Sequence, residues 1–189
     1  MRNPIAVGER LYLRPLEEQD AEVMAAGSAL EIETMMDRMR LPFSPIALAN
    51  WIKKLSKEQP PDYISLGVCL KADDRHIGIV ELFELDYVDR TAETGSWINL
   101  PQDRGQGYGT EAKMLLLEYA FERLGLHALM SYVWEPNVRS AAALLKQGYK
   151  PAGRFKFEDV RDGVYRDGLL FDVLREDWLA AREALNARE

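Results

Sequence analysis

Three strand-like stretches follow one another between residues 63 and 100, and their succession limits the folds open to the chain. They read YISLGVCLKA, HIGIVELFELDYV and TAETGSWINL. Each has the length and the apolar, β-branched and aromatic content of a strand, and an Asp73-Asp74 turn separates the first two. This segment predicts an antiparallel meander.

Helical and strand-like segments on both sides of the meander complete the pattern of one α+β domain. Further strands are expected at 10–14, at 127–135 and on either side of Asp162-Gly163, a dipeptide that favours a hairpin turn. Helices are expected at 17–27, in two pieces between 29 and 57 that Pro42 and Pro45 interrupt, at 109–124, at 140–147 and at the C-terminal end. Because no repeat, linker or low-complexity tract divides the chain, we predict a single domain over residues 1–189.

Composition and charge narrow the class of protein. The 189 residues are 47% hydrophobic and 29% charged, which is ordinary for a globular protein. The net charge of -7 argues against a nucleic-acid partner, which favours a basic surface. No apolar run is long enough for a signal peptide or a membrane span, and the single cysteine, Cys69, cannot form an internal disulfide. We therefore expect a cytoplasmic protein without membrane contact, with Cys69 as a buried structural thiol.

Glycines at positions 105, 107 and 109 lie directly before a helical stretch, in LPQDRGQGYGTEA. The segment lacks the lysine of a nucleotide-triphosphate loop, and its spacing differs from the dinucleotide fingerprint G-x-G-x-x-G. A glycine-rich turn at a helix N-terminus nevertheless directs several backbone N–H groups outward, where the helix dipole adds partial positive charge. On these grounds two interpretations stay open: a tight strand-to-helix turn, or a site for a pyrophosphate that needs no metal.

The sequence RGQGYG, from Arg104 to Gly109, resembles the [Arg/Gln]-x-x-Gly-x-[Gly/Ala] loop that binds acetyl-coenzyme A in the GNAT superfamily of N-acetyltransferases. AETGSWINLP before the loop is similar to the fourth strand of that fold, and EPNVRSAAALLKQGYKPAGRF after it resembles the family's Asn-bearing helix. The C-terminal GRFKFEDVRDGVYRDGLLFDVLREDW is similar to the tail of the ribosomal-protein N-terminal acetyltransferases. The resemblance implies a mixed, mostly antiparallel sheet of about seven strands with helices on both faces. It also implies acetyl-coenzyme A as cosubstrate, with no metal.

The same resemblance implies which residues bind the cosubstrate. Backbone groups of the fourth strand would bond to the pantetheine arm, and one N–H there would polarise the thioester carbonyl. These residues are Trp97, Ile98, Asn99 and Leu100. The loop and the first helical turn would hold the pyrophosphate, through Arg104, Gly105, Gln106, Gly107, Tyr108, Gly109 and Thr110. Asn137 would meet the pantetheine from the next strand, although a helix N-cap is its alternative interpretation.

Two carboxylates are candidates for the base that deprotonates the attacking amine. Glu93 lies where many of these enzymes carry a glutamate in the fourth strand, although its position also fits an exposed acid at a strand start. Glu81 stands in a strand that reads as buried on both faces. It is therefore either a partner in a core ion pair or an acid of the substrate site.

The proton donor to the leaving thiolate is less well defined. Many family members have a tyrosine seven residues after the asparagine, where this chain has Leu144. That departure leaves Ser140, Tyr132 or a water as the general acid, with a helix cap as the alternative role of Ser140. His76 and His127 stand at strand starts and read as surface residues.

The combined prediction is acetyl transfer from acetyl-coenzyme A to a primary amine through a ternary complex. A non-catalytic acyl-coenzyme A sensor and a module for another phosphorylated ligand are the alternatives. The acceptor is expected to be a peptide N-terminus or a small molecule. Residues 29–61 are expected to form its wall, where Glu31, Glu33 and Asp37 would suit a cation. A homodimer is one assembly compatible with this sequence.

Overall fold

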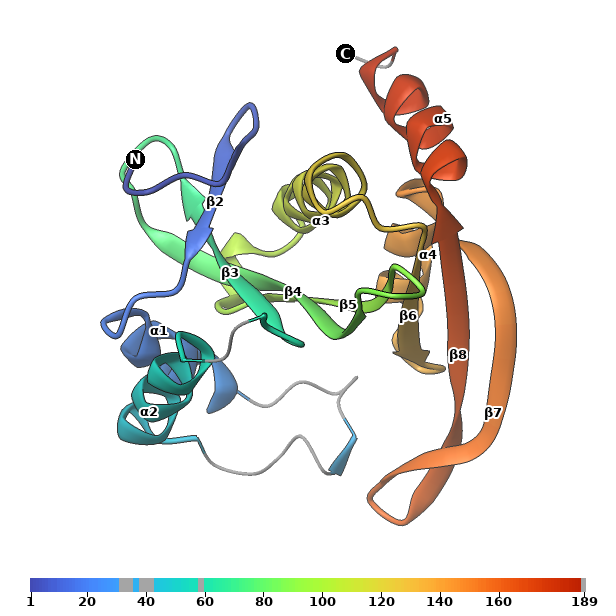
Figure 1. Cartoon of the computed structure of the whole chain (residues 1–189). Coiled ribbons are helices and arrows are strands. Elements are labelled where there is room, and N and C mark those ends of the chain that lie inside the picture. The colour runs from blue at the N-terminus through green and yellow to red at the C-terminus, as the bar shows by residue number, and fades with distance from the viewer. Residues whose placement is uncertain (31–35, 38–42, 58–59, 188–189) are drawn as a thin grey trace. The chain divides into compact units, whose positions relative to one another are not determined.

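The computed structural model describes residues 1–30, 36–37, 43–57 and 60–187 (Figure 1). These residues form two compact units, which are described one at a time. Of the described residues, the first contains 1–30, 43–57 and 60–126, and the second contains 36–37 and 127–187. The single domain over residues 1–189 stays a prediction. Glu31 and Glu33, and the first of the two helices expected between 29 and 57, lie outside the described residues.

The sheet of the first unit has five strands in chain order, and each neighbouring pair is antiparallel. The strands are β1 (Ala6–Val7), β2 (Leu11–Pro15), β3 (Ile64–Leu70), β4 (His76–Asp86) and β5 (Thr91–Ile98). The predicted meander is confirmed as β3, β4 and β5, with Val80 opposite Leu66 on one side and opposite Ser96 on the other. β1 is not among the predicted strands, because two residues carry no periodic signal.

Two helices, α1 (Asp20–Ser28) and α2 (Pro45–Leu55), pack together on one face of this sheet (Figure 1). Buried side chains of both helices form an apolar cluster with Ile79 of β4. α2 begins with Pro45, whose missing N–H costs nothing at a first helical position, and the Ser44 side chain accepts a hydrogen bond from the amide of Ala47. The proline that was expected to interrupt the helical region, Pro45, is thus the first residue of α2.

The helix α3 (Tyr108–Glu118) lies on the opposite face, and a short 3-10 turn, η2 (Pro101–Asp103), connects it to β5 (Figure 1). α3 continues as a π-helical turn, η3 (Tyr119–Arg123). It ends before Gly125, whose φ of 66° suits a residue just after a helix. Because strand side chains alternate between the faces, Ile79, Glu81 and Phe83 of β4 face α1 and α2, and Val80 and Leu82 face α3.

The second unit is built on three antiparallel strands with the last one in the middle. The strands are β6 (Ala128–Trp134), β7 (Lys150–Arg161) and β8 (Val164–Leu174), and β8 pairs with both others. Asp162 and Gly163 connect β7 to β8 with φ angles of 50° and 78°. Two left-handed residues are what a tight type I′ hairpin turn requires, so the predicted hairpin is confirmed. α4 (Val138–Lys146) follows β6, and α5 (Arg175–Asn186) follows β8.

The α+β class and the antiparallel pairing predicted from the sequence are confirmed, and β1 brings the described strands to eight. Cys69 is buried as expected. The prediction for His76 is wrong, because only 7% of this residue is exposed. Its ring lies over Gly67 of β3, where a Cβ would come within 3.1 Å of the ring, so the glycine makes room for it. No helix within the described ranges is both long and apolar enough to cross a membrane.

Candidate functional site

The glycine-rich turn between β5 and α3 has left-handed backbone conformations at two of its three glycines. Gly105 has a φ of 76° and Gly107 a φ of 83°, whereas Gly109 is already part of α3. Residues with a Cβ rarely adopt such angles, so the backbone path itself requires glycine at both positions. A Cβ at Gly107 would also lie 3.2 Å from Nη2 of Arg10.

Five consecutive amides in this turn, those of residues 105 to 109, have no hydrogen-bond acceptor in the described part of the chain. The next two amides, of Thr110 and Glu111, both donate to the carbonyl oxygen of Gly107 at 3.1 Å. Residues 105 to 107 are exposed. Unpaired N–H groups that converge at a helix N-terminus, where the helix dipole is positive, attract an anion. The turn is therefore a candidate site for a phosphate or pyrophosphate.

Arg104 is directed at the end of β5. Its Nε donates to the carbonyl oxygen of Ile98 at 3.0 Å, and its Nη2 donates to that of Asn99 at 2.9 Å. The guanidinium also lies over the ring of Trp97, 5.4 Å from its centre. In this structure Arg104 fixes the strand that leads into the turn.

Arg10 is a second cation at the turn, and sequence reasoning missed it. Its Nη1 donates to the carbonyl oxygen of Gln106 at 2.9 Å, and its guanidinium lies 4.9 Å from the ring centre of Tyr108. Its Nε pairs with Glu111 at 2.9 Å, so part of its charge is neutralised. No local pattern could reveal it, because Arg10 and Gln106 are 96 residues apart in the sequence.

The backbone of β5 presents a set of peptide groups away from β4. The amide of Asn99 donates to the carbonyl oxygen of Ile77 at 2.9 Å, which makes these two residues a hydrogen-bonded pair. Such pairs alternate along antiparallel strands, so Trp97 likewise bonds to β4, where it lies opposite Ile79. The N–H groups of Ser96 and Ile98 therefore point away from β4. An extended chain on that side could bond to Ile98 as a further strand would.

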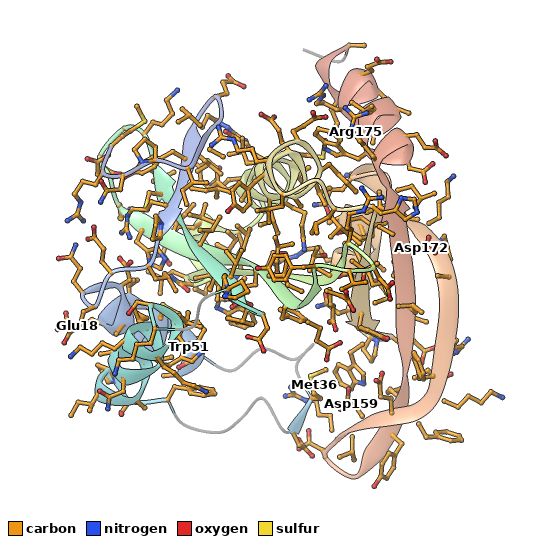
Figure 2. The ribbon with its side chains drawn as sticks, viewed as in Figure 1. Glu18, Met36, Trp51, Asp159, Asp172 and Arg175 are labelled. Atoms are coloured by element: carbon orange, nitrogen blue, oxygen red, sulfur yellow. The ribbon has the colours of Figure 1, made fainter. Side chains whose placement is uncertain are left out.

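Glu81 lies on the α1 and α2 face and is held by two hydroxyl groups. The Tyr63 hydroxyl donates to its Oε1, and the Ser65 hydroxyl donates to the same oxygen at 3.2 Å. Burial raises the pKa of Glu81 above its usual range, and the two hydroxyls limit the rise. The Tyr63 ring stacks on Phe83, with ring centres 5.9 Å apart. It meets Trp51 of α2, which is labelled in Figure 2, edge-on with ring centres 6.0 Å apart. The hydrogen-bond partners of Glu81 are thus hydroxyl groups, whereas the sequence analysis had considered a core ion pair.

Glu93 is the diagonal neighbour of Glu81 on the same face of the sheet. Glu81 lies opposite Gly95, and Glu93 lies opposite Phe83. A Cβ at Gly95 would be 3.0 Å from Oε2 of Glu81 and 2.9 Å from the Phe83 ring. Because Gly95 has no side chain, it leaves room for the side chains of Glu81 and Phe83.

Lys113 of α3 is a buried cation, with 2% of its surface exposed. Burial lowers its pKa to about 7, and the negative charges of Glu81 and Glu93 oppose that change. Sequence analysis missed Lys113, because a lysine on a helix normally reads as solvent-exposed. The two candidate bases and this lysine thus form one electrostatic group.

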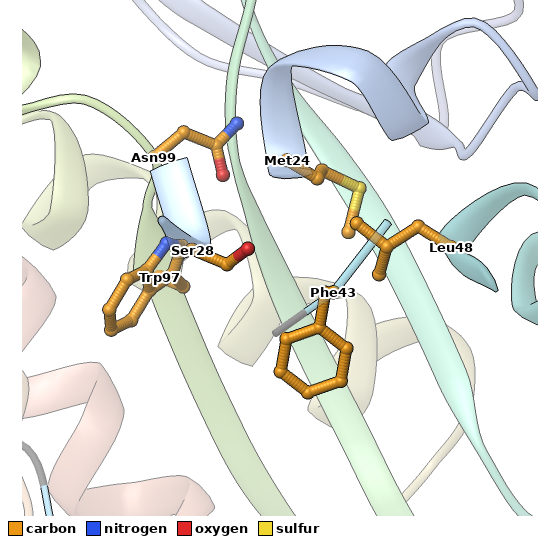
Figure 3. A pocket seen from close by; sticks show the side chains of 6 residues that line it. All are labelled: Met24, Ser28, Phe43, Leu48, Trp97 and Asn99. Atoms are coloured by element: carbon orange, nitrogen blue, oxygen red, sulfur yellow. The ribbon is translucent and has the colours of Figure 1, made fainter. Parts of the chain in front are cut away.

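A pocket of about 130 Å³ lies beside the end of β5, among α1, α2 and the strand (Figure 3). Its lining residues are Met24, Ser28, Phe43, Leu48, Trp97 and Asn99. The Asn99 side chain is buried, with Nδ2 3.5 Å from Nδ1 of His76. Burial lowers the pKa of His76 to about 4, so the ring is neutral near pH 7. The pocket surface is almost entirely apolar.

The remaining predicted site residues belong to the second unit. Asn137 is the N-cap of α4, and its Oδ1 accepts a hydrogen bond from the amide of Ser140 at 3.2 Å. Leu144 is buried, with 3% of its surface exposed. Tyr132 is partly exposed, and its ring centre is 5.6 Å from that of Phe155. The N-cap role of Asn137 is therefore present, and its role towards a cosubstrate stays a prediction.

Metal binding has no obvious place in the described ranges. Within them, no group of three or more His, Cys, Asp or Glu side chains is arranged to hold a metal ion.

Comparison with known proteins gives one family match. The family model described as an acetyltransferase (GNAT) domain matches residues 10–150. The spermidine N(1)-acetyltransferase of Escherichia coli (strain K12) is 27% identical over 169 residues, which are 89% of this chain and 88% of that protein. The putative ribosomal N-acetyltransferase YdaF of Bacillus subtilis (strain 168) is 26% identical over 175 residues, 91% of this chain and 95% of that protein.

A solved structure supports the same fold. A crystal structure described as a probable acetyltransferase superposes with a TM-score of 0.81 at 26% sequence identity. The superposition covers 93% of this chain and 98% of the other.

Proposed function

Because the chain belongs to the acetyltransferase (GNAT) family, we propose that it transfers the acetyl group of acetyl-coenzyme A to a primary amine, by direct attack in a ternary complex. The row of unpaired amides at residues 105 to 109 is the observation that carries this proposal. A pyrophosphate offers acceptors to these donors without a metal, and the N-terminus of α3 favours its charge.

The cosubstrate would be held by the turn and by β5. Residues 105 to 110 would bind the pyrophosphate, with Arg10 and Arg104 adding positive charge nearby. The outward N–H of Ile98 would bond to the pantetheine arm, and a neighbouring N–H between Trp97 and Leu100 would polarise the carbonyl. Asn137 stays a predicted contact of the cosubstrate. The bound cosubstrate supplies an activated thioester.

The acceptor amine must lose a proton before it attacks. Deprotonation at pH 7 costs roughly 4.6 kcal/mol for a lysine side chain and about 1 kcal/mol for an α-amino group. Glu81 is suited to receive this proton, directly or through a water, because burial raises its pKa towards the working range. Glu93 is the second candidate on the same face. An α-amine, or another amine of low pKa, is the easier acceptor.

Transfer forms the C–N bond, breaks the C–S bond and leaves a thiolate that needs a proton. Ser140, close to Asn137 at the start of α4, is the side chain we assign to this step. Leu144 occupies the position of the tyrosine that serves many family members, and it is buried. That observation favours one competing function, a sensor that binds acyl-coenzyme A without turnover.

Two measurements separate these functions. Calorimetric titration with coenzyme A, acetyl-coenzyme A and ATP should show binding of the two coenzyme A forms with ATP far weaker. Thiol release from acetyl-coenzyme A should then accelerate when a primary amine is added. Binding without any amine-dependent thiol release would leave the sensor, and preferential ATP binding would refute the acetyltransferase assignment of the turn.

A further inference from the structure

The apolar pocket beside β5 lies on the same face of the strand as the two candidate bases. Trp97 lines the pocket, and Glu93 is four residues earlier in the same strand, so both side chains point to the α1 and α2 side. Gly95 lies between them and Glu81 is opposite it. A strand rises about 3.3 Å per residue, so the space at Gly95 and the pocket at Trp97 are separated by about 7 Å.

The lining of the pocket favours an uncharged occupant. Met24 of α1, Leu48 of α2 and Phe43 supply apolar side chains, and Ser28 and Asn99 are the polar lining residues (Figure 3). Ser28 itself donates to the carbonyl oxygen of Ala25 at 2.8 Å. An apolar cavity of roughly 150 Å³ is known to accept a benzene ring, and this pocket measures about 130 Å³. An aliphatic or aromatic group of that size fits it.

We propose that this pocket selects the acceptor, and that the preferred acceptors are primary amines with an aliphatic or aromatic substituent close to the nitrogen. This inference rests on the proposed acetyl transfer and adds the substrate class. The amine lies near Gly95, within reach of Glu81 and Glu93, and its substituent enters the pocket at Trp97. Hydrophobic N-terminal residues and arylalkylamines belong to this class.

A polyamine is a poor match to the same geometry. Spermidine carries a second ammonium group where the proposed acceptors carry their apolar substituent. An ammonium group in the pocket would lose its hydration, and none of the six lining side chains is a carboxylate. The negative charges of Glu81 and Glu93 lie on the amine side, where they favour the first nitrogen only. The described lining of the pocket therefore does not favour a polycation, despite the net charge of -7.

The test compares three amino-acid amides, which share an α-amine and differ only in the side chain, with the polyamine spermidine. Leucinamide, phenylalaninamide, glycinamide and spermidine would be supplied with acetyl-coenzyme A, and kcat/KM for each would be measured from thiol release. We expect leucinamide and phenylalaninamide to exceed glycinamide and spermidine at least about tenfold, the discrimination an apolar pocket can provide. Equal or higher kcat/KM for spermidine would overturn the inference while leaving the acetyl transfer intact.

A matched pair of variants locates the selectivity. Leu48→Glu puts a charge into the pocket, and Ile46→Glu makes the same change on the first turn of α2, where Ile46 is 74% exposed and outside the pocket lining. Leu48→Glu should lower kcat/KM for leucinamide at least about tenfold and change that for glycinamide little, and Ile46→Glu should change neither. Coenzyme A affinity, measured by calorimetry, should stay the same in both variants and reports that the fold is intact. Equal loss for glycinamide and leucinamide, or loss in Ile46→Glu alone, would refute the pocket assignment.

Binding without turnover distinguishes this inference from the proposed function. Phenylalaninamide would be titrated into the coenzyme A complex by calorimetry. Suppose that no amine accelerates thiol release but phenylalaninamide still binds to the parent protein and not to Leu48→Glu. The pocket is then an amine-binding site, and the proposed acetyl transfer is wrong. If phenylalaninamide binds neither, the pocket assignment is wrong. A gain for longer acyl-coenzyme A donors that Leu48→Glu abolishes would also overturn it, because the pocket would then hold the acyl chain.

Discussion

Replacement of Gly107 by valine should abolish coenzyme A binding with only a modest loss of stability. At a φ of 83°, a β-branched residue costs roughly 1–3 kcal/mol of backbone strain, which the chain relieves by turning this peptide group. The new side chain would also displace the Arg10 guanidinium, whose Nη2 lies 3.2 Å from the Cβ position. A hydrogen bond to a charged group contributes roughly 1.5–3 kcal/mol. If two of the five amides can no longer donate to the pyrophosphate, the binding free energy weakens by about 3–6 kcal/mol. That corresponds to roughly a hundredfold to ten-thousandfold increase in Kd.

Gly125→Val is the matched control for this change. Gly125 has a φ of 66°, lies after α3, and has no atom within 4 Å of its Cβ position. Both variants should lose a similar free energy of unfolding in thermal melts, because both place valine in a left-handed conformation. Calorimetric titration with coenzyme A should show the large loss of affinity only for Gly107→Val. Equal Kd values for the two variants would refute the role of the turn in holding the cosubstrate.

The buried titratable groups give three further predictions. His76 is protonated below pH 6.5 in the unfolded chain but only near pH 4 in the folded chain. The free energy of unfolding should therefore fall by roughly 3 kcal/mol as the pH is lowered over that range. In chemical denaturation, His76→Leu should make this fall smaller, and an unchanged fall would contradict the burial of a neutral His76. Lys113 has a folded pKa of about 7, so stability should rise between pH 7 and pH 10, and Lys113→Met should stabilise the protein at pH 7 by up to roughly 4 kcal/mol and remove the rise. Tyr63→Phe removes a hydrogen bond that favours ionised Glu81, so the acid limb of kcat/KM against pH should move to higher pH. An unshifted limb would remove Glu81 from the proton path.

The order of elements could be predicted from local patterns, because those patterns reflect local physics. Runs of apolar, β-branched and aromatic residues predicted β3, β4 and β5, and Asp162-Gly163 predicted the hairpin because such residues adopt left-handed backbone angles. The glycine-rich turn was recognisable for the same reason, since Gly105 and Gly107 hold angles that other residues avoid. Predictions of this kind need only a few neighbouring residues.

The features that were missed all depend on contacts between distant segments. Arg10 reaches the turn across 96 residues. Lys113 and His76 look like surface residues in the sequence, and they are buried because α3 and the neighbouring Gly67 place them against the sheet. Glu81 drew attention as a buried charge, but only the structure shows that hydroxyl groups hold it. A linear pattern cannot supply such partners, because they are set by strand register and helix packing.

The most direct test of the account is an initial-rate study of thiol release in which acetyl-coenzyme A and leucinamide are both varied. Direct transfer in a ternary complex predicts intersecting double-reciprocal lines, with N-acetyl-leucinamide formed in the same amount as free coenzyme A and identified by mass spectrometry. Parallel lines with an acetylated protein would contradict direct attack. Thiol release that leaves leucinamide unmodified would contradict the acetyltransferase function itself.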